Sequence, residues 1–191
     1  MDLPIFEGNN SGRIFERARA RNVAAANAGD WDVALFADAD IVLDSREQAE
    51  AALMRSYLTG AYTVAYSTMR YVTEESTAQW EKSVGSMGTP EWDEEVGRTW
   101  ECCFAIRRDY FDKVGGFDER FKGYGGQVAA FFYAYATFAG RERIEGLAYH
   151  LNHPLVDRSD DPTFEENVQL AERYKKAVDD PTAMTAMLAE R

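Results

Sequence analysis

Apolar residues form two kinds of pattern in the first third of the chain. Residues 33–37 are a continuous apolar run, Val-Ala-Leu-Phe-Ala, which predicts a strand buried on both faces. Residues 46–58 follow helical spacing after Ser45, with Gln48 at the capping-box position, and residues 61–71 predict a second strand. A helix between two strands is typical of α/β domains, so we expect a mostly parallel central sheet flanked by helices.

The rest of the chain continues this alternation. Further strands are expected at 3–7, 100–107 and 144–149, and further helices at 14–28, 108–114, 128–139, 163–178 and after Pro181. Residues 73–98 lack clean periodicity and include Trp80 and Trp92, so we expect a functional loop there. Because the last helices are polar, we divide the chain into an α/β domain at 1–160 and a C-terminal helical extension at 161–191.

Composition and charge narrow the range of functions. The chain has 191 residues, of which 46% are hydrophobic, and this is enough for one domain with its own core. The formal net charge of −12 argues against a broad basic surface for nucleic acid and against polybasic docking to a membrane. Arg13, Arg17, Arg19 and Arg21 are the exception, and on one helix they form either a solvated face or a nucleic-acid contact.

The sequence shows no membrane-spanning segment, secretory signal or disulfide framework, and this predicts where in the cell the protein is found. No apolar run approaches the ~20 residues that span a bilayer, and no secretory signal is visible at the start of the chain. The two cysteines, Cys102 and Cys103, are adjacent and offer no disulfide framework. We therefore expect a cytoplasmic protein without a membrane span.

Two carboxylates follow the buried strand at 33–37. If the strand continues through Asp38 and Asp40, their side chains point the same way, at the strand end where α/β sheets bind ligands. Carboxylates are ligands that Mg²⁺ and Mn²⁺ prefer, commonly together with substrate phosphates. His150 and His153 are further candidate metal ligands. The alternatives are a turn with two solvated aspartates, and histidines that serve only the structure.

A glycine-rich segment at residues 115–126 is a second candidate for a ligand-binding loop. It holds five glycines in twelve residues, which indicates left-handed backbone or a close approach of the main chain. Such a loop can admit a ligand against its backbone. A plain turn between two elements is the alternative.

Taken in order, several segments resemble the GT-A-fold glycosyltransferases, in particular the family-2-like group and the galactosyltransferase C-terminal motif. The resemblance covers about residues 3–156 and assigns 1–160 to a GT-A-like glycosyltransferase domain. The segments that carry it are Arg21-Asn22, Phe36-Ala37-Asp38-Ala39-Asp40, Phe104-Ala105-Ile106-Arg107-Arg108, the glycine-rich segment 115–126 (GGFDERFKGYGG) and residues 150–154 (HLNHP).

This resemblance implies a metal-dependent glycosyltransferase whose donor is a nucleotide-diphosphate sugar. In such enzymes the Asp-x-Asp motif holds Mn²⁺ or Mg²⁺ against the diphosphate, and a late histidine completes the metal shell. The resemblance assigns the metal to Asp38, Asp40, His153 and, as second choice, His150. It assigns the donor to Arg21, Asn22, Asp38, Trp100, Gly125 and Gly126, and it leaves the acceptor open among a glycan, a protein and a small molecule.

Two departures from the family pattern change this expectation. The family continues Gly-Gly with an acidic pair that supplies the general base, but this chain has Gln127-Val128, and neither side chain accepts a proton at neutral pH. Three alternatives follow. The general base could be Glu101, Asp118 or Glu119 instead, or a retaining mechanism could need no such base. The third alternative is that the chain is an impaired subunit that still binds the donor. The usual first strand–helix unit is also lacking, so a partner chain or a second copy is a candidate for completing the nucleotide pocket.

Overall fold

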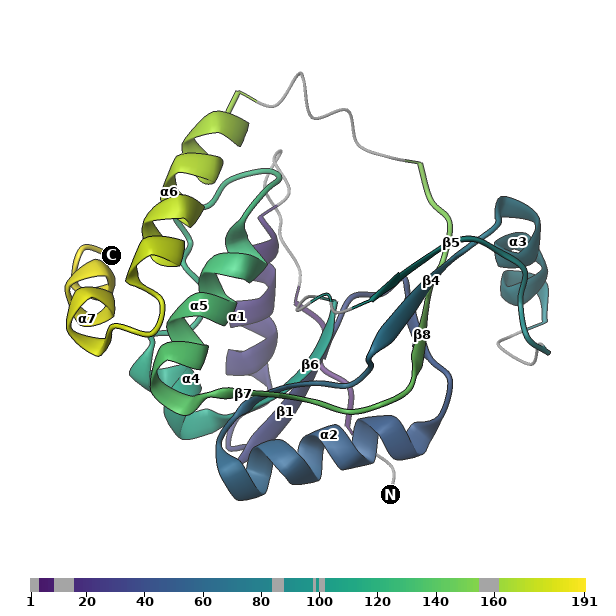
Figure 1. The fold of residues 1–191 in the computed structure, drawn as a ribbon, viewed down its shortest axis with the longest axis horizontal. Helices are drawn as coiled ribbons and strands as arrows, with labels where there is room; N and C mark the ends of the chain where they lie inside the picture. The colour runs from purple at the N-terminus through teal and green to yellow at the C-terminus, as the bar shows by residue number, and fades with distance from the viewer. Residues whose placement is uncertain (1–3, 9–15, 84–87, 98, 100–101, 155–161) are drawn as a thin grey trace.

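The computed structural model describes residues 4–8, 16–83, 88–97, 99, 102–154 and 162–191. It is an α/β structure of two four-stranded sheets with helices packed around them (Figure 1). The strands are β1 (Val33–Ala37), β2 (Ile41–Leu43), β3 (Tyr62–Val64), β4 (Thr68–Val72), β5 (Trp92–Gly97), β6 (Cys103–Arg107), β7 (Arg141–Arg143) and β8 (Leu147–His150). The helices are α1 (Arg17–Asn27), α2 (Arg46–Thr59), α3 (Glu74–Lys82), α4 (Arg108–Lys113), α5 (Gln127–Ala139), α6 (Phe164–Ala177) and α7 (Pro181–Ala189).

The first sheet has the strand order β1-β6-β3-β7 and is mixed, not mostly parallel as the alternation of elements predicted. β1 and β3 run in the same direction, but β6 lies between them and is antiparallel to both, while β7 pairs with β3 in parallel. Short-range alternation shows that strands and helices follow one another. It does not show that a strand from much later in the chain inserts between the first two.

The second sheet has the order β2-β8-β4-β5. It includes β4, which forms the second half of the strand expected at 61–71. That stretch divides after Val64, since β3 belongs to the first sheet and β4 to the second. Gln48 ties the junction together, because its amide donates to the carbonyls of Ala65 (3.1 Å) and Leu147 (3.0 Å). Its side-chain oxygen accepts from the Ser45 N–H at 3.0 Å, as the capping pattern predicted.

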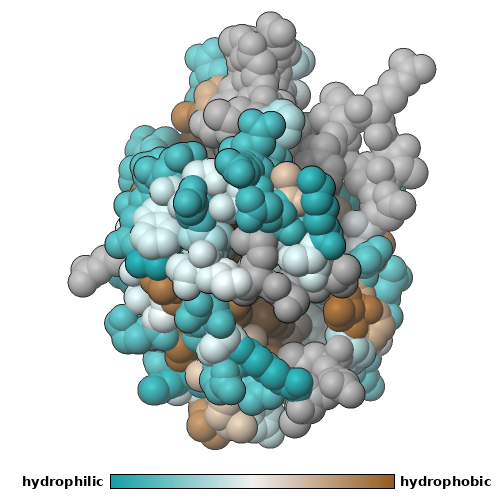
Figure 2. Space-filling view, turned by 90° about the vertical axis from the view of Figure 1, so that its right-hand side faces the viewer, coloured by the Kyte–Doolittle hydropathy of each residue, from teal (hydrophilic) through white to brown (hydrophobic). Residues whose placement is uncertain are grey.

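Two regions differ from the expected elements. Residues 73–98 do not form one long loop, because α3 begins after Thr73, whose hydroxyl caps it, and β5 pairs with β4. Nearly every side chain of β5 is exposed, so the strand carries no apolar alternation that would reveal it. Among the residues that are coloured on this side of the molecule, hydrophilic ones are common (Figure 2). The strand expected at 3–7 is also wrong over its described residues, which have no regular secondary structure and leave Ile5 87% exposed.

The core lies on both faces of the first sheet. α2 packs against β1, β3 and β6 on one side, and α4 and α5 cover the other side (Figure 1). Phe104 of β6 is fully buried, and its ring stacks on Tyr62 at 4.5 Å between centroids. Phe117 stacks on Phe131 of α5 at 4.0 Å. β1 is an edge strand of this sheet, and only Phe36 of its residues is buried while Ala37 is exposed, so the prediction that the run at 33–37 is buried on both faces is wrong.

The last two helices add to this core, and the glycine-rich segment runs beneath them. Tyr174 of α6 and Met184 of α7 are fully buried. Gly126 adopts a φ of 72°, and a Cβ added there would lie 2.7 Å from the Cβ of Ala171 in α6. Asn167 of α6 fixes the same turn, because its amide donates to the Tyr124 carbonyl at 2.8 Å. The structure therefore gives Gly126 a packing reason for being glycine.

We predict that Gly126→Ala lowers the free energy of unfolding by about 3 kcal/mol, since a new Cβ adds overpacking to left-handed strain. Gly29→Ala is the matched control, because Gly29 has a φ of 67° with nothing within 4 Å of the added Cβ. It should cost only about 1 kcal/mol of strain. Urea unfolding measures both values, and equal losses would contradict the close packing of this loop against α6.

Candidate metal centre

Asp40, His150 and His153 converge at one point of the second sheet. One ligand atom from each lies within 4.8 Å of the others. The Asp40 Oδ2 atom is 3.1 Å from His153 Nε2 and 3.6 Å from His150 Nε2. Asp40 sits in the turn between β1 and β2, and the two histidines end β8 and follow it. Three of the four expected metal ligands therefore come together.

Backbone pairing brings these distant segments side by side. β2 and β8 are antiparallel with Ile41 opposite His150, and the Leu151 N–H donates to the Asp40 carbonyl at 2.8 Å. On the other side of β8, Tyr71 of β4 pairs with His150, and the two rings lie 4.9 Å apart. The Asn152 N–H donates to the Thr77 hydroxyl of α3 at 2.9 Å. Helix α3, which the sequence pattern did not reveal, thus helps to hold the histidine segment.

The hydrogen-bond pattern of the imidazoles leaves their Nε2 atoms facing the carboxylate. His150 Nδ1 lies 2.9 Å from the Leu151 carbonyl, and His153 Nδ1 lies 3.0 Å from the Pro154 carbonyl. Because a carbonyl only accepts, each Nδ1 carries a hydrogen in these contacts, so that Nε2 of each ring is the nitrogen left to face Asp40 and to bind a metal. Lone pairs and a carboxylate that converge in this way need a cation or additional protons between them.

A buried oxygen without a partner points to the same conclusion. Asp40 Oδ1 is buried, and no hydrogen-bond donor contacts it among the described residues. Such an atom is costly unless a ligand satisfies it. One carboxylate and two imidazole nitrogens fit a divalent cation, and the nitrogens favour a transition metal such as Mn²⁺ over Mg²⁺.

Asp38 does not join this cluster. β1 ends at Ala37 and the chain turns at once, so the two aspartates do not share one face of a strand. The Asp38 carboxylate accepts a hydrogen bond from Arg21, and its N–H donates to the Cys102 carbonyl at 2.8 Å. Arg21 is only 8% exposed and lies over the ring of Phe117. Asp38 is thus paired inside the protein.

The arginines of α1 also contact acidic side chains of the same chain. Arg17 lies 3.8 Å from Asp38, and Arg19 lies 3.7 Å from Glu16. Arg13 lies outside the described residues. This arrangement accounts for the basic helix through contacts within the protein and gives no support to nucleic-acid binding.

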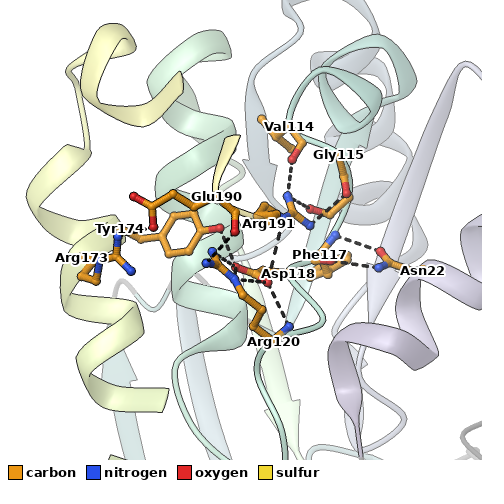
Figure 3. A network of polar contacts seen from close by, with 11 residues as sticks. Asn22, Val114, Gly115, Phe117, Asp118, Arg120, Arg173, Tyr174, Glu190 and Arg191 are labelled. Atoms are coloured by element: carbon orange, nitrogen blue, oxygen red, sulfur yellow. Dashed lines mark hydrogen bonds and ion pairs between the residues drawn. The ribbon is translucent and has the colours of Figure 1, made fainter. Parts of the chain in front are cut away.

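Asn22 of α1 contacts the loop that follows α4, to which Glu119 belongs. The Asn22 amide donates to the Phe117 carbonyl at 2.9 Å (Figure 3). It also donates to the Glu119 carboxylate at 2.9 Å. Its side-chain oxygen accepts from the Phe117 N–H at 2.9 Å. Asn22 therefore fastens α1 to this loop, which accounts for the Arg-Asn pair without a donor ligand.

Asp118 sits at the centre of a second polar network. Its carboxylate accepts from Arg120 at 2.7 Å and from the Tyr174 hydroxyl at 2.8 Å, and the C-terminal Arg191 lies beside it (Figure 3). Burial would raise the pKa of Asp118, but these hydrogen bonds outweigh it and hold the pKa below its usual value. A carboxylate fixed in this way is poorly suited to accept a proton from a substrate.

Gln127, Val128 and Gly125 lie around the start of α5. Gln127 is 5% exposed and donates to the Gly123 carbonyl at 3.1 Å, and Val128 is 2% exposed. Trp100 and Glu101 lie outside the described residues. Gly125, like Gly126, has a positive φ and lies against α6, where Phe164 would meet an added Cβ at 3.2 Å.

A cavity of about 680 Å³ lies next to these elements, and sequence reasoning missed it. Tyr71 connects it to the candidate metal centre through its contact with His150. Cys102 connects it to Asp38, which precedes Asp40 by two residues. The aromatic residues of α5 were its only sequence signal, and they also fit a core helix. Its described lining residues are Met69, Tyr71, Thr99, Cys102, Ala129, Phe132, Tyr133 and Arg141, with no carboxylate among them.

Comparisons with known proteins add no assignment. No protein-family model matches the chain, and no curated protein matches it in sequence. Within the described ranges, no helix is both long enough and apolar enough to cross a membrane.

We predict that Asp118→Asn destabilises the fold by about 1–3 kcal/mol at neutral pH, because it removes a buried carboxylate that accepts several hydrogen bonds. The folded pKa lies below the unfolded value near 3.8. The stabilisation is therefore fully present above that value and is lost as the pH falls through the folded pKa. Urea unfolding from pH 7 to pH 2 should show the difference between variant and parent shrinking below about pH 4. The exposed Asp93→Asn should show no such loss, and a difference that stays constant with pH would contradict the network's charge.

Proposed function

We propose that the protein is a metal-dependent glycosyltransferase of the GT-A type that moves a sugar from a nucleotide-diphosphate sugar to an acceptor hydroxyl. The observation that carries this proposal is the convergence of Asp40, His150 and His153 beside a cavity of substrate size. The resemblance of the ordered motifs to GT-A glycosyltransferases supports it. Mn²⁺ is the proposed metal, with Mg²⁺ as the alternative.

The chemistry of the transfer explains why a cation is needed. The bond between the anomeric carbon and the diphosphate oxygen breaks, the acceptor oxygen bonds to that carbon, and the electron pair leaves with the diphosphate. A bound divalent cation stabilises this developing negative charge. Asp40, His150 and His153 would hold it. Arg21 neutralises Asp38, so that the turn bearing Asp40 does not carry two unpaired carboxylates.

The fate of the acceptor proton leads to a second candidate function. Gln127 and Val128, which stand where the family has its acidic pair, are buried, and neither lines the cavity. No carboxylate stands among the described residues of the cavity wall. This observation favours an impaired transferase that binds the donor, or a retaining enzyme in which a phosphate oxygen of the donor takes the proton.

We predict that Mn²⁺ raises the melting temperature, and that one of the UDP-, GDP-, TDP- or CDP-sugars raises it further only with the metal, because ligands stabilise the state that binds them. Asp40→Asn and His153→Ala should each weaken metal binding at least tenfold, as measured by thermal shift at graded Mn²⁺ concentrations.

The control for this experiment is Asp93→Asn, which removes an exposed carboxylate of β5 and should leave the metal response unchanged. Mg²⁺, Zn²⁺ and Fe²⁺ tested in parallel identify the preferred cation. A metal response that survives Asp40→Asn and His153→Ala would contradict the proposed centre.

We predict that a carboxylate placed on the cavity-facing side of α5 supplies the missing base. Ala129→Asp should increase transfer to an active acceptor by about 10²–10⁴-fold while donor affinity changes little. Gln127→Glu should give no such gain, because residue 127 is buried away from the cavity, and Ala51→Asp on the exposed face of α2 is the surface control. A large gain from Gln127→Glu alone would show that a different face of α5 meets the acceptor.

A further inference from the structure

The cavity beside the candidate metal centre has walls from several elements. Met69 and Tyr71 come from β4, and Ala129, Phe132 and Tyr133 come from one face of α5. Its volume of about 680 Å³ lies within the range of pockets that enclose small organic ligands. A small molecule therefore fits this space.

The walls of the cavity are mainly aromatic and apolar. Tyr71, Phe132 and Tyr133 present rings, and Met69 adds a polarisable thioether. The hydroxyl of Thr99 is already bonded to that of Tyr66 at 2.6 Å. Besides Arg141, the hydroxyls of Tyr71 and Tyr133 are the other polar side-chain groups among the described walls. These groups suit a ligand with a few polar substituents on a flat apolar body better than the many hydroxyls of a free sugar.

Arg141 gives the cavity a positive charge. Its guanidinium contacts Asp179, but this pair is long, at 3.5 Å, and exposed, with 43% and 63% of the two side chains accessible. Such a surface pair contributes little free energy and is easily exchanged for another anion. Arg141 is the one charged side chain among the described lining residues, and it favours an anion at its end of the cavity.

The same cavity lies one aromatic ring away from the candidate metal centre. Tyr71 lines it, and the Tyr71 ring packs against the ring of His150 at 4.9 Å between centroids. Cys102 lines it as well, and its carbonyl accepts from the Asp38 N–H at 2.8 Å. A molecule in this cavity would lie beside the donor.

We propose that the cavity binds the acceptor, and that the acceptor is a small molecule with an aromatic body and one anionic group, such as a hydroxylated aromatic carboxylate. The designation as acceptor rests on the proposed transferase function. The affinity of the cavity for an aromatic anion rests only on its walls and on Arg141.

Two fluorescent probes test the cavity directly. 1-Anilinonaphthalene-8-sulfonate carries an aromatic body and an anion, and N-phenyl-1-naphthylamine has a similar body without charge. Both should bind the folded protein saturably, at one site. Ala129→Trp fills the cavity and should weaken both probes at least tenfold, whereas Ala51→Trp on the exposed face of α2 should change neither. Ala129→Leu, a smaller obstruction, replaces the tryptophan variant if that variant melts early.

Two charge variants test the role of Arg141. Arg141→Gln should weaken the sulfonate probe about tenfold and leave the neutral probe unchanged. Asp179→Asn should strengthen the sulfonate probe, because it removes the competing carboxylate at a position whose φ of 63° asparagine tolerates. Binding that Ala129→Trp does not weaken would overturn the assignment of the site, and equal effects of Arg141→Gln on both probes would overturn the anionic group.

These titrations are made with EDTA and without donor, so they separate this proposal from the proposed function. Probe binding at the cavity without any response to metal or nucleotide sugar would uphold the aromatic-anion site and reject its designation as an acceptor site. Metal and donor binding without probe binding would reject the aromatic-anion site and leave the transferase proposal standing.

Discussion

The pairing of β2 with β8 is the contact on which the candidate metal centre depends. Asp40 and His150 are more than a hundred positions apart in the chain, and the register that sets Ile41 opposite His150 brings them together. The hydrogen bond from the Leu151 N–H to the Asp40 carbonyl fixes the same alignment. A slip of one residue would turn the His150 ring to the other face of the sheet and separate the ligands.

The two aspartates of the Asp-x-Asp motif make different contacts and have different roles. Asp38 is neutralised by Arg21, which is itself held between aromatic rings, while Asp40 turns toward the imidazoles. Two neighbouring carboxylates with no cation repel each other, and pairing one of them internally leaves a single carboxylate for a ligand. Asn22 and Asp118, like Asp38, are bonded within the protein. They connect α1 and the C-terminal helices to the loop after α4.

The sequence pattern predicted the local parts of this structure well. The run at 33–37 is the strand β1 over the same residues, although it is a partly buried edge strand and not one buried on both faces. The capped helix at 46–58 is α2 within one residue at its end, because an apolar run and a capping box are local signals. Asp40, His150 and His153 were candidates for a common site, and the structure brings them together. Asp38 differs, because no spacing rule shows that Arg21 would reach its carboxylate.

The sequence pattern did not predict the features that depend on contacts between distant parts of the chain. The insertion of β6 between β1 and β3 made the sheet mixed, and it depends on pairing between strands far apart in the chain. The exposed strand β5 lacks alternation, and Thr77 of α3 supports the histidine segment through one hydroxyl. The cavity gave no separate signal either, because Phe132 and Tyr133 fit a core helix as well as a binding wall.

The most direct test of the metal centre uses the fact that the chain has only two histidines. A ¹H–¹⁵N spectrum of the imidazole side chains should show both rings with hydrogen on Nδ1. One equivalent of Mn²⁺ should then broaden the Nε2 signals of His150 and His153 together, through the unpaired electrons of the metal. Signals that persist at one equivalent, or the loss of only one of the two, would contradict a shared site on Asp40, His150 and His153.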